Sequence, residues 1–284
     1  MSMGASGGEH GAEGEGGGRP AWAALRCMSN FSFLRGASHP EELVRRAGEL
    51  GCAALALTDE CSLAGVVRAH VAAREAGVKL LVGSQFRLRL DAGHEAVLVL
   101  LARHRADYAA LCRFITGLRR ASPKGSYRLE LEQLLRQPPG GCLGVLCLPR
   151  RADDARLLGW AAALRDGLGA ASDQDAGHGL LLGVELHREL DDARWLQRLR
   201  ALSRCLGLEL VACPDVQMHA ASRQPLHDTL CAIRLGRDLA GCGVELQPNA
   251  ERALQDLEQL GRRYPADLLE AGARLARECV FSLE

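Results

Sequence analysis

The chain has no excess of either charge, very little lysine and few aromatic side chains. Its 284 residues include 35 Lys and Arg and 35 Asp and Glu side chains, so the formal net charge is zero. A domain that binds duplex DNA usually has a positive net charge. Only Lys79 and Lys124 are lysines, and aromatic residues make up 4% of the chain. Because arginine is abundant together with alanine, glycine and leucine, we interpret the arginine content as a coding bias. A role with nucleic acid is therefore expected to be local, indirect or supplied elsewhere.

Long apolar runs and paired cysteines are also missing. No run reaches the roughly 18 apolar residues of a membrane span, and the Gly/Glu-rich start, residues 1–18, lacks the apolar centre of a signal peptide. The 11 cysteines include no pair at C-x-x-C spacing, which argues against a zinc cluster. These features predict a protein of the reducing cytoplasm that makes no contact with a membrane.

Apolar runs alternate with helical patterns after residues 1–19, which we expect to form a flexible leader. The unit is repeated about seven times between residues 22 and 216, which is typical of parallel α/β folds, either a barrel or a doubly wound sheet. From residue 223 the pattern predicts only helices, and a loop is expected at 166–178. The expected strands are 22–28, 52–57, 79–82, 96–102, 141–148, 180–185 and 208–212, and the last three helices are 223–237, 249–262 and 265–279.

In parallel α/β folds, functional side chains gather at the carboxyl ends of the strands. Several expected strands end in residues that could take part in such a site. Local roles are the alternative: Asp59 as a cap of the next helix, and Glu185 with His187 as a buried hydrogen-bonded pair. The candidates are Arg26, Met28, Asp59, Glu60, Gln85, His187, Asp215 and Gln217.

Four segments carry a family resemblance: residues 27–44 (CMSNFSFLRGASHPEELV), 54–70 (ALALTDECSLAGVVRAH), 182–188 (LGVELHR) and 228–236 (DTLCAIRLG). They resemble the N-terminal region of bacterial error-prone DNA polymerases, C-family enzymes related to the polymerase III alpha subunit. That region is a polymerase and histidinol phosphatase (PHP) domain. The resemblance implies a distorted seven-stranded β/α barrel over 20–222. A helical extension over 223–284 would lead toward a polymerase palm beyond this chain.

The resemblance also implies a degraded metal site. In active relatives, His, Asp and Glu side chains at the strand ends hold two or three metals that activate water against a phosphoester. Here Arg26-Cys27-Met28 replaces the first His-x-His, and Asp59-Glu60 replaces Asp-His. Gln85 replaces a Glu, Asp215-Val216-Gln217 replaces Asp-x-His, and His187 is a remaining polar group. We expect vestigial positions only, with no catalytic residue and no metal or other cofactor in this chain.

A guanidinium can take over the charge balance that metals provide. Carboxylates that share one pocket without metal repel each other, and an arginine can bind them in two-pronged fashion while it stays charged. We therefore predict that Arg26 pairs with Asp59 or Asp215, with Gln85 and Gln217 completing the hydrogen bonding. The alternative is that Arg26 reaches solvent and the acids cap helices.

Three function classes follow. The first is a structural domain of a damage-induced polymerase for translesion synthesis, inactive alone. It would act through the rest of the polymerase chain, whose palm would use Mg²⁺, and through the sliding clamp and mutagenesis accessory proteins, meeting DNA only indirectly. The others are a stand-alone metal-dependent phosphoesterase or exonuclease, and a binding module for a small ligand.

Two surface features have no assigned role at this point. One is a mildly basic cluster of Arg119, Arg120 and Lys124 with Tyr127, which could contact DNA. The other is an apolar helix face of Leu226, Leu230, Ile233 and Leu235, which predicts self-association.

Overall fold

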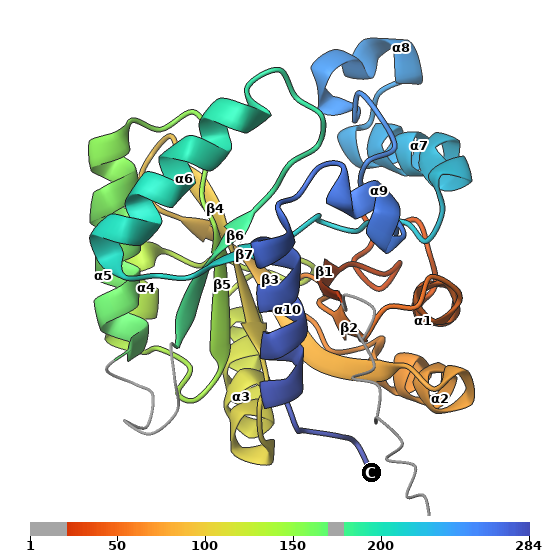
Figure 1. Cartoon of the computed structure of the whole chain (residues 1–284), viewed down its shortest axis with the longest axis horizontal. Coiled ribbons are helices and arrows are strands. Elements are labelled where there is room, and N and C mark those ends of the chain that lie inside the picture. Colours follow the sequence, from red (N-terminus) through yellow and green to blue (C-terminus); the bar gives the residue numbers. More distant parts are fainter. Residues whose placement is uncertain (1–21, 170–178) are drawn as a thin grey trace, which may run out of the picture.

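Seven strands form one curled sheet whose spatial order follows the sequence (Figure 1). The computed structural model describes residues 22–169 and 179–284, so the expected leader and residues 170–178 of the expected loop lie outside the described residues. The expected seven-stranded α/β fold is confirmed. The strands are β1 (Ala23–Cys27), β2 (Ala54–Leu57), β3 (Lys79–Arg89), β4 (Glu95–Leu101), β5 (Leu143–Cys147), β6 (Leu180–Val184) and β7 (Leu210–Ala212).

The sheet is mixed, so the expectation of parallel strands throughout is wrong at β4. This strand runs antiparallel to both β3 and β5, with register from Gly83 opposite Leu101 to Arg89 opposite Glu95. The reason is that β3 continues well past its expected end at Val82 and reverses in a short turn. A parallel neighbour would need a crossover of a dozen or more residues, which this turn does not provide.

Helices cover the convex face of the sheet and bury one stripe of apolar side chains each. One helix of this layer follows each of β1, β2, β5 and β6, two follow β4, and none lies between β3 and β4. The helix α5 extends to Gly169, so the first residues of the expected loop at 166–178 are helical. The helices of this layer are α1 (Pro40–Glu49), α2 (Val66–Ala76), α3 (Arg105–Arg120), α4 (Leu131–Arg136), α5 (Asp154–Gly169) and α6 (Asp192–Leu206).

The helix α10 (Ala266–Glu278) lies across the concave side of the sheet, drawn in dark blue in Figure 1. The inward side chains of the strands are small or aliphatic, and α10 packs onto them through Ala271, Leu275 and Ala276. In the described part of the chain the edge strands β1 and β7 do not pair with each other, and β1 instead bridges to the segment after β7, between Cys27 and Val216. The barrel is thus distorted, and a helix closes the side that strand pairing leaves open.

The chain after β7 forms short helices beside the carboxyl ends of the strands. The expected helices at 223–237 and 265–279 are confirmed by α7 and α10, whereas 249–262 is helical only in α9. The reason is that residues 252–254 run beside residues 217 and 218 and exchange backbone hydrogen bonds with them. No helix in the described part of the chain is long and apolar enough to cross a membrane. The remaining elements are η1 (Ala221–Arg223), α7 (Gln224–Leu235), α8 (Leu239–Cys242), η2 (Gly243–Glu245) and α9 (Leu257–Gly261).

Candidate functional site

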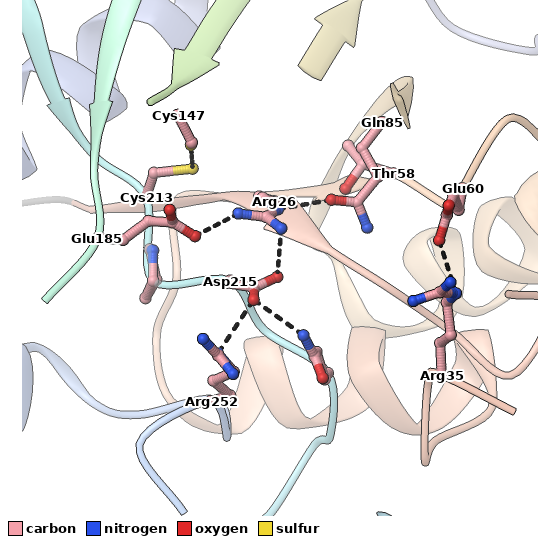
Figure 2. Close-up of polar contacts among 12 residues, drawn as sticks. Arg26, Arg35, Thr58, Glu60, Gln85, Cys147, Glu185, Cys213, Asp215 and Arg252 are labelled. Carbon is pink, nitrogen blue, oxygen red and sulfur yellow. Dashed lines mark hydrogen bonds and ion pairs between the residues drawn. The ribbon is translucent and has the colours of Figure 1, made fainter. Parts of the chain in front are cut away.

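The site centres on Arg26, whose guanidinium lies among the carboxyl ends of β1 and β6, β3 and the segment after β7 (Figure 2). The side chain is buried, with 6% of the residue exposed. Its Nε donates to Gln85 Oε1 at 2.5 Å, its Nη1 donates to Glu185 Oε1 at 2.5 Å, and its Nη2 lies 2.9 Å from Asp215 Oδ1. Burial alone would lower the pKa of Arg26, but Asp215 and Glu185 outweigh it and raise the pKa. Arg26 is therefore a permanent cation held by two acids and an amide.

Asp215 joins Arg26 to a second arginine. Its Oδ2 lies 3.0 Å from Arg252 Nε and accepts a hydrogen bond from Gln217 Nε2 at 2.8 Å. The contacts to the two arginines are ion pairs by distance rather than aligned hydrogen bonds. Burial would raise the pKa of Asp215, but Arg26 and then Arg252 outweigh it and lower the pKa. The predicted pairing of Arg26 with Asp215, supported by Gln85 and Gln217, is confirmed.

Asp59 has a different role from either of those expected. It accepts hydrogen bonds from Ser29 N at 2.9 Å, Ser29 Oγ at 2.7 Å and Ser32 Oγ at 2.7 Å, and only 1% of it is exposed. Pairing of Asp59 with Arg26 is thus wrong, because two serines of the β1–α1 loop satisfy the carboxylate. The cap of the following helix is also wrong, since α2 begins after Gly65 with no side-chain cap. Burial raises the pKa of Asp59 despite these hydrogen bonds.

Glu60 belongs to a neighbouring polar cluster. Its Oε2 lies 2.9 Å from Arg35 Nε, and its Oε1 accepts a hydrogen bond from the Tyr127 hydroxyl at 2.9 Å. Arg87 Nε lies 3.4 Å from the same Oε1. Glu60 therefore anchors arginines on the surface beside the site, and no contact between its side chain and Arg26 occurs in the described structure.

The proposed Glu185–His187 pair is wrong. Glu185 turns to Arg26, whereas His187 Nε2 lies 3.1 Å from the carbonyl oxygen of Pro214. Both residues follow the end of β6 at Val184, where the chain leaves the strand, so strand alternation no longer keeps their side chains on one face. Burial lowers the pKa of His187, and Arg252 lowers it further. Met28 is buried at the same rim, where its backbone N–H donates to Val216.

The donor set does not fit the metals of active relatives. Two guanidinium groups, Arg26 and Arg252, occupy the space next to Asp215, and Glu185 is engaged by Arg26. A divalent cation is repelled by fixed cations and needs carboxylates that are free to coordinate it. Across residues 22–169 and 179–284, no group of three or more His, Cys, Asp or Glu side chains could hold a metal ion. That the eight candidate positions are remnants of a metal site stays a prediction.

Two functional features do not follow from the sequence pattern: Arg252 and a second layer of polar residues around Gln217. The Gln217 Oε1 accepts from Gln247 Nε2 at 2.7 Å and lies 2.8 Å from His227 Nε2. Arg252 was overlooked because its segment was expected to be helical and separate from the strand ends. A Pro-Asn pair at 248–249, which disfavours a helix start at 249, was the available signal.

Comparisons with known proteins agree with the fold and with the resemblance. The PHP domain profile matches residues 24–144. The chain is 51% identical over 263 residues to the error-prone DNA polymerase of Methylococcus capsulatus, covering 93% of this chain and 24% of that protein. It is 43% identical over 293 residues to the error-prone DNA polymerase of Azoarcus sp., covering 93% of this chain and 26% of that protein.

A solved structure shares the fold at low sequence identity. An amidohydrolase from Chromobacterium violaceum, with bound sulfate and no metal, superposes with a TM-score of 0.50 at 18% identity. The match covers 69% of this chain and 88% of that one. The chain spans about a quarter of the length of the curated polymerases it matches. It thus carries a PHP domain and is homologous, over 93% of its length, to the N-terminal quarter of bacterial error-prone DNA polymerases.

Proposed function

We propose that this chain is a non-catalytic structural domain of a cytoplasmic error-prone DNA polymerase that acts in damage-induced translesion synthesis. The observation that carries the proposal is the buried Arg26 with Glu185 and Asp215 at the strand ends. The whole polymerase would be a nucleotidyltransferase with Mg²⁺ in its palm. Its partners would be the sliding clamp and mutagenesis accessory proteins.

The chemistry of arginine supports a structural role. A guanidinium has five N–H donors and no lone pair for a metal, stays protonated at physiological pH, and neither coordinates nor deprotonates water. At Arg26, Nε and Nη1 donate to Gln85 and Glu185, and Nη2 lies at ion-pair distance from Asp215, so the guanidinium contacts three other segments of the sheet rim. The arginine neutralises the acids and ties these segments together, as a metal would, without supplying a reactive water.

A chimera tests the proposal. In the Methylococcus capsulatus polymerase, the homologous N-terminal quarter is replaced by residues 20–284 of this chain. We expect the chimera to be stable and to extend primers, and the same chimera with Arg26→Met to unfold at lower temperature with loss of extension. The isolated chain should neither hydrolyse bis(p-nitrophenyl) phosphate nor retain Mn²⁺ or Zn²⁺ after gel filtration. Stoichiometric metal that Asp215→Asn abolishes, or hydrolysis that depends on such metal, would contradict the proposal and favour the phosphoesterase alternative.

A further inference from the structure

A cleft of about 680 Å³ opens beside the site, between the β1–α1 loop, the β3–β4 hairpin and the segment from Gly125 to Leu129. It shares Arg35, Glu60, Arg87 and Arg234 with a smaller cavity of about 340 Å³ that reaches inward to Arg26. The two spaces form one trough along the rim of the sheet. Neither the Arg26 network nor the fold accounts for the composition of its outer part.

The outer cleft carries a local excess of positive charge in a chain that is neutral overall. Only Glu60 and Glu95 among its lining residues are acidic, against six arginines, whereas the whole chain has 35 residues of each sign. The clustering is the informative feature, because a coding bias raises the number of arginines without gathering them on one face. The six are Arg35, Arg87, Arg89, Arg119, Arg128 and Arg234.

The carboxylates of the cleft are too few to satisfy these cations. Glu60 pairs with both Arg35 and Arg87, and Arg87 also lies 3.9 Å from Glu95. Glu130 is shared between Arg89, at 3.7 Å, and Arg128. Arg234 is exposed, and within residues 22–169 and 179–284 no carboxylate lies within ion-pair distance of it. Burial lowers the pKa of Arg35, and the neighbouring Arg87 and Arg234 lower it further, as expected where like charges crowd.

An exposed aromatic side chain stands at the edge of the same cleft. Phe33 is 81% exposed and Phe31 is 36% exposed, both on the β1–α1 loop. The loop cannot rearrange to bury Phe33, because hydrogen bonds hold Ser29 and Ser32 to the buried Asp59. The ring of Phe33 is therefore held in solvent at the edge of the cleft, next to the arginines.

We infer that this cleft binds single-stranded DNA directly, with phosphates along the arginines and a base stacked on Phe33. Arginines that track a phosphate backbone and aromatic rings that stack bases are the two elements of sequence-tolerant single-strand sites. Paired bases in a duplex offer no free face to Phe33, and an acidic peptide would use the arginines but not the ring. The inference goes beyond the proposed structural role, and it departs from the expectation that the chain meets DNA only indirectly.

Fluorescence anisotropy with a labelled oligothymidylate of about 12 nucleotides tests this on the full chain. The competitors are a duplex of equal length and polyglutamate. The charge variant combines Arg89→Gln, Arg128→Gln and Arg234→Gln, and the stacking variant is Phe33→Ala. Matched controls off the cleft are Arg46→Gln, Arg156→Gln and Arg262→Gln together, and the exposed Leu190→Ala. Thermal unfolding verifies that every variant is folded.

We expect the single strand to bind more tightly than the duplex or polyglutamate. Between about 50 and 200 mM salt, affinity should fall, and the charge variant should reduce the slope of log K against log salt by roughly 2, about 0.7 for each lost phosphate contact. Phe33→Ala should weaken binding about 5- to 100-fold. No binding at low salt, a duplex or polyglutamate that competes equally well, or control variants that weaken binding as much as the cleft variants would each overturn the inference.

Discussion

Arg26→Met is the sharpest test of the site, because it removes a buried cation and keeps most of the volume of its side chain. In the native protein Arg26 neutralises Glu185 and Asp215. Breaking a buried ion pair from one side costs about 3–5 kcal/mol. We expect the lower end, about 3 kcal/mol, since Asp215 keeps Arg252 and Gln217 and the Glu185 side chain is 22% exposed. At about 2–4 °C per kcal/mol, the midpoint of thermal unfolding should fall by roughly 6–12 °C.

The pH dependence distinguishes lost charge balance from lost packing. The native pKa of Asp215 is lowered, so this group stabilises the fold above its ordinary pKa and loses that contribution as pH falls through the lowered value. Without Arg26, burial pushes the pKa of Asp215 upward. In the variant, Asp215 therefore takes up a proton at a higher pH than in the native protein. The difference in stability between the variant and the native protein should shrink as the pH falls toward about 4.

A control variant removes Arg26 together with the two acidic residues that it neutralises. The triple variant Arg26→Met, Glu185→Gln, Asp215→Asn leaves no uncompensated buried acid at these positions, and it should recover most of the lost stability, because replacing a whole buried pair is often nearly neutral. Circular dichroism during heating, from about pH 4 to pH 8, measures all three proteins. An Arg26→Met protein that melts at the native temperature, or a deficit that does not change with pH, would refute the reasoning.

Three further outcomes are expected. Asp59→Asn should cost about 2 kcal/mol in urea unfolding and speed amide hydrogen exchange in residues 29–36, since the carboxylate accepts three charge-assisted hydrogen bonds from Ser29 and Ser32; unchanged exchange would show that these bonds do not hold the loop. The lowered pKa of His187 makes the native protein lose stability as pH falls below about 6.5, and His187→Gln should flatten that part of the urea-midpoint profile; an equally steep variant would argue against it. Light scattering should show self-association that Leu226→Gln with Ile233→Gln weakens, because both side chains are exposed on α7; a monomer at every concentration would contradict this.

The parts of the structure that follow from local pattern were predictable. Strands such as β2 and β5 are uninterrupted apolar runs, and the strand-end rule brought Arg26 and Asp215 together. The direction of β4 was not predictable, since an apolar run of that length is equally compatible with either direction of pairing. The sequence does not identify the partners of Asp59, because Ser29 and Ser32 of the loop after β1 fold back onto it, a loop conformation that periodicity does not encode.

The position of α10 could not be predicted from the sequence for a related reason. Its pattern of Leu and Ala predicts an amphipathic helix, but does not say which surface that helix covers. The structure places Leu275 and Ala276 on the concave side of the sheet, among side chains from both edge strands, β1 and β7. Arg252 was missed in the same way, because its contact with Asp215 joins segments whose proximity depends on the finished fold.

The placement of α10 has a consequence for synthesis on the ribosome. The strand β1 emerges first, yet the helix that covers its inner face begins at Ala266, so roughly 240 residues must be translated in between. At about 5–20 residues per second, the inner faces of Leu25 and Ala56 stay without their final cover for roughly 10–50 s. Nascent chains that pause before Ala266 therefore present an open apolar trough, the kind of surface that chaperones bind and that aggregates when they do not.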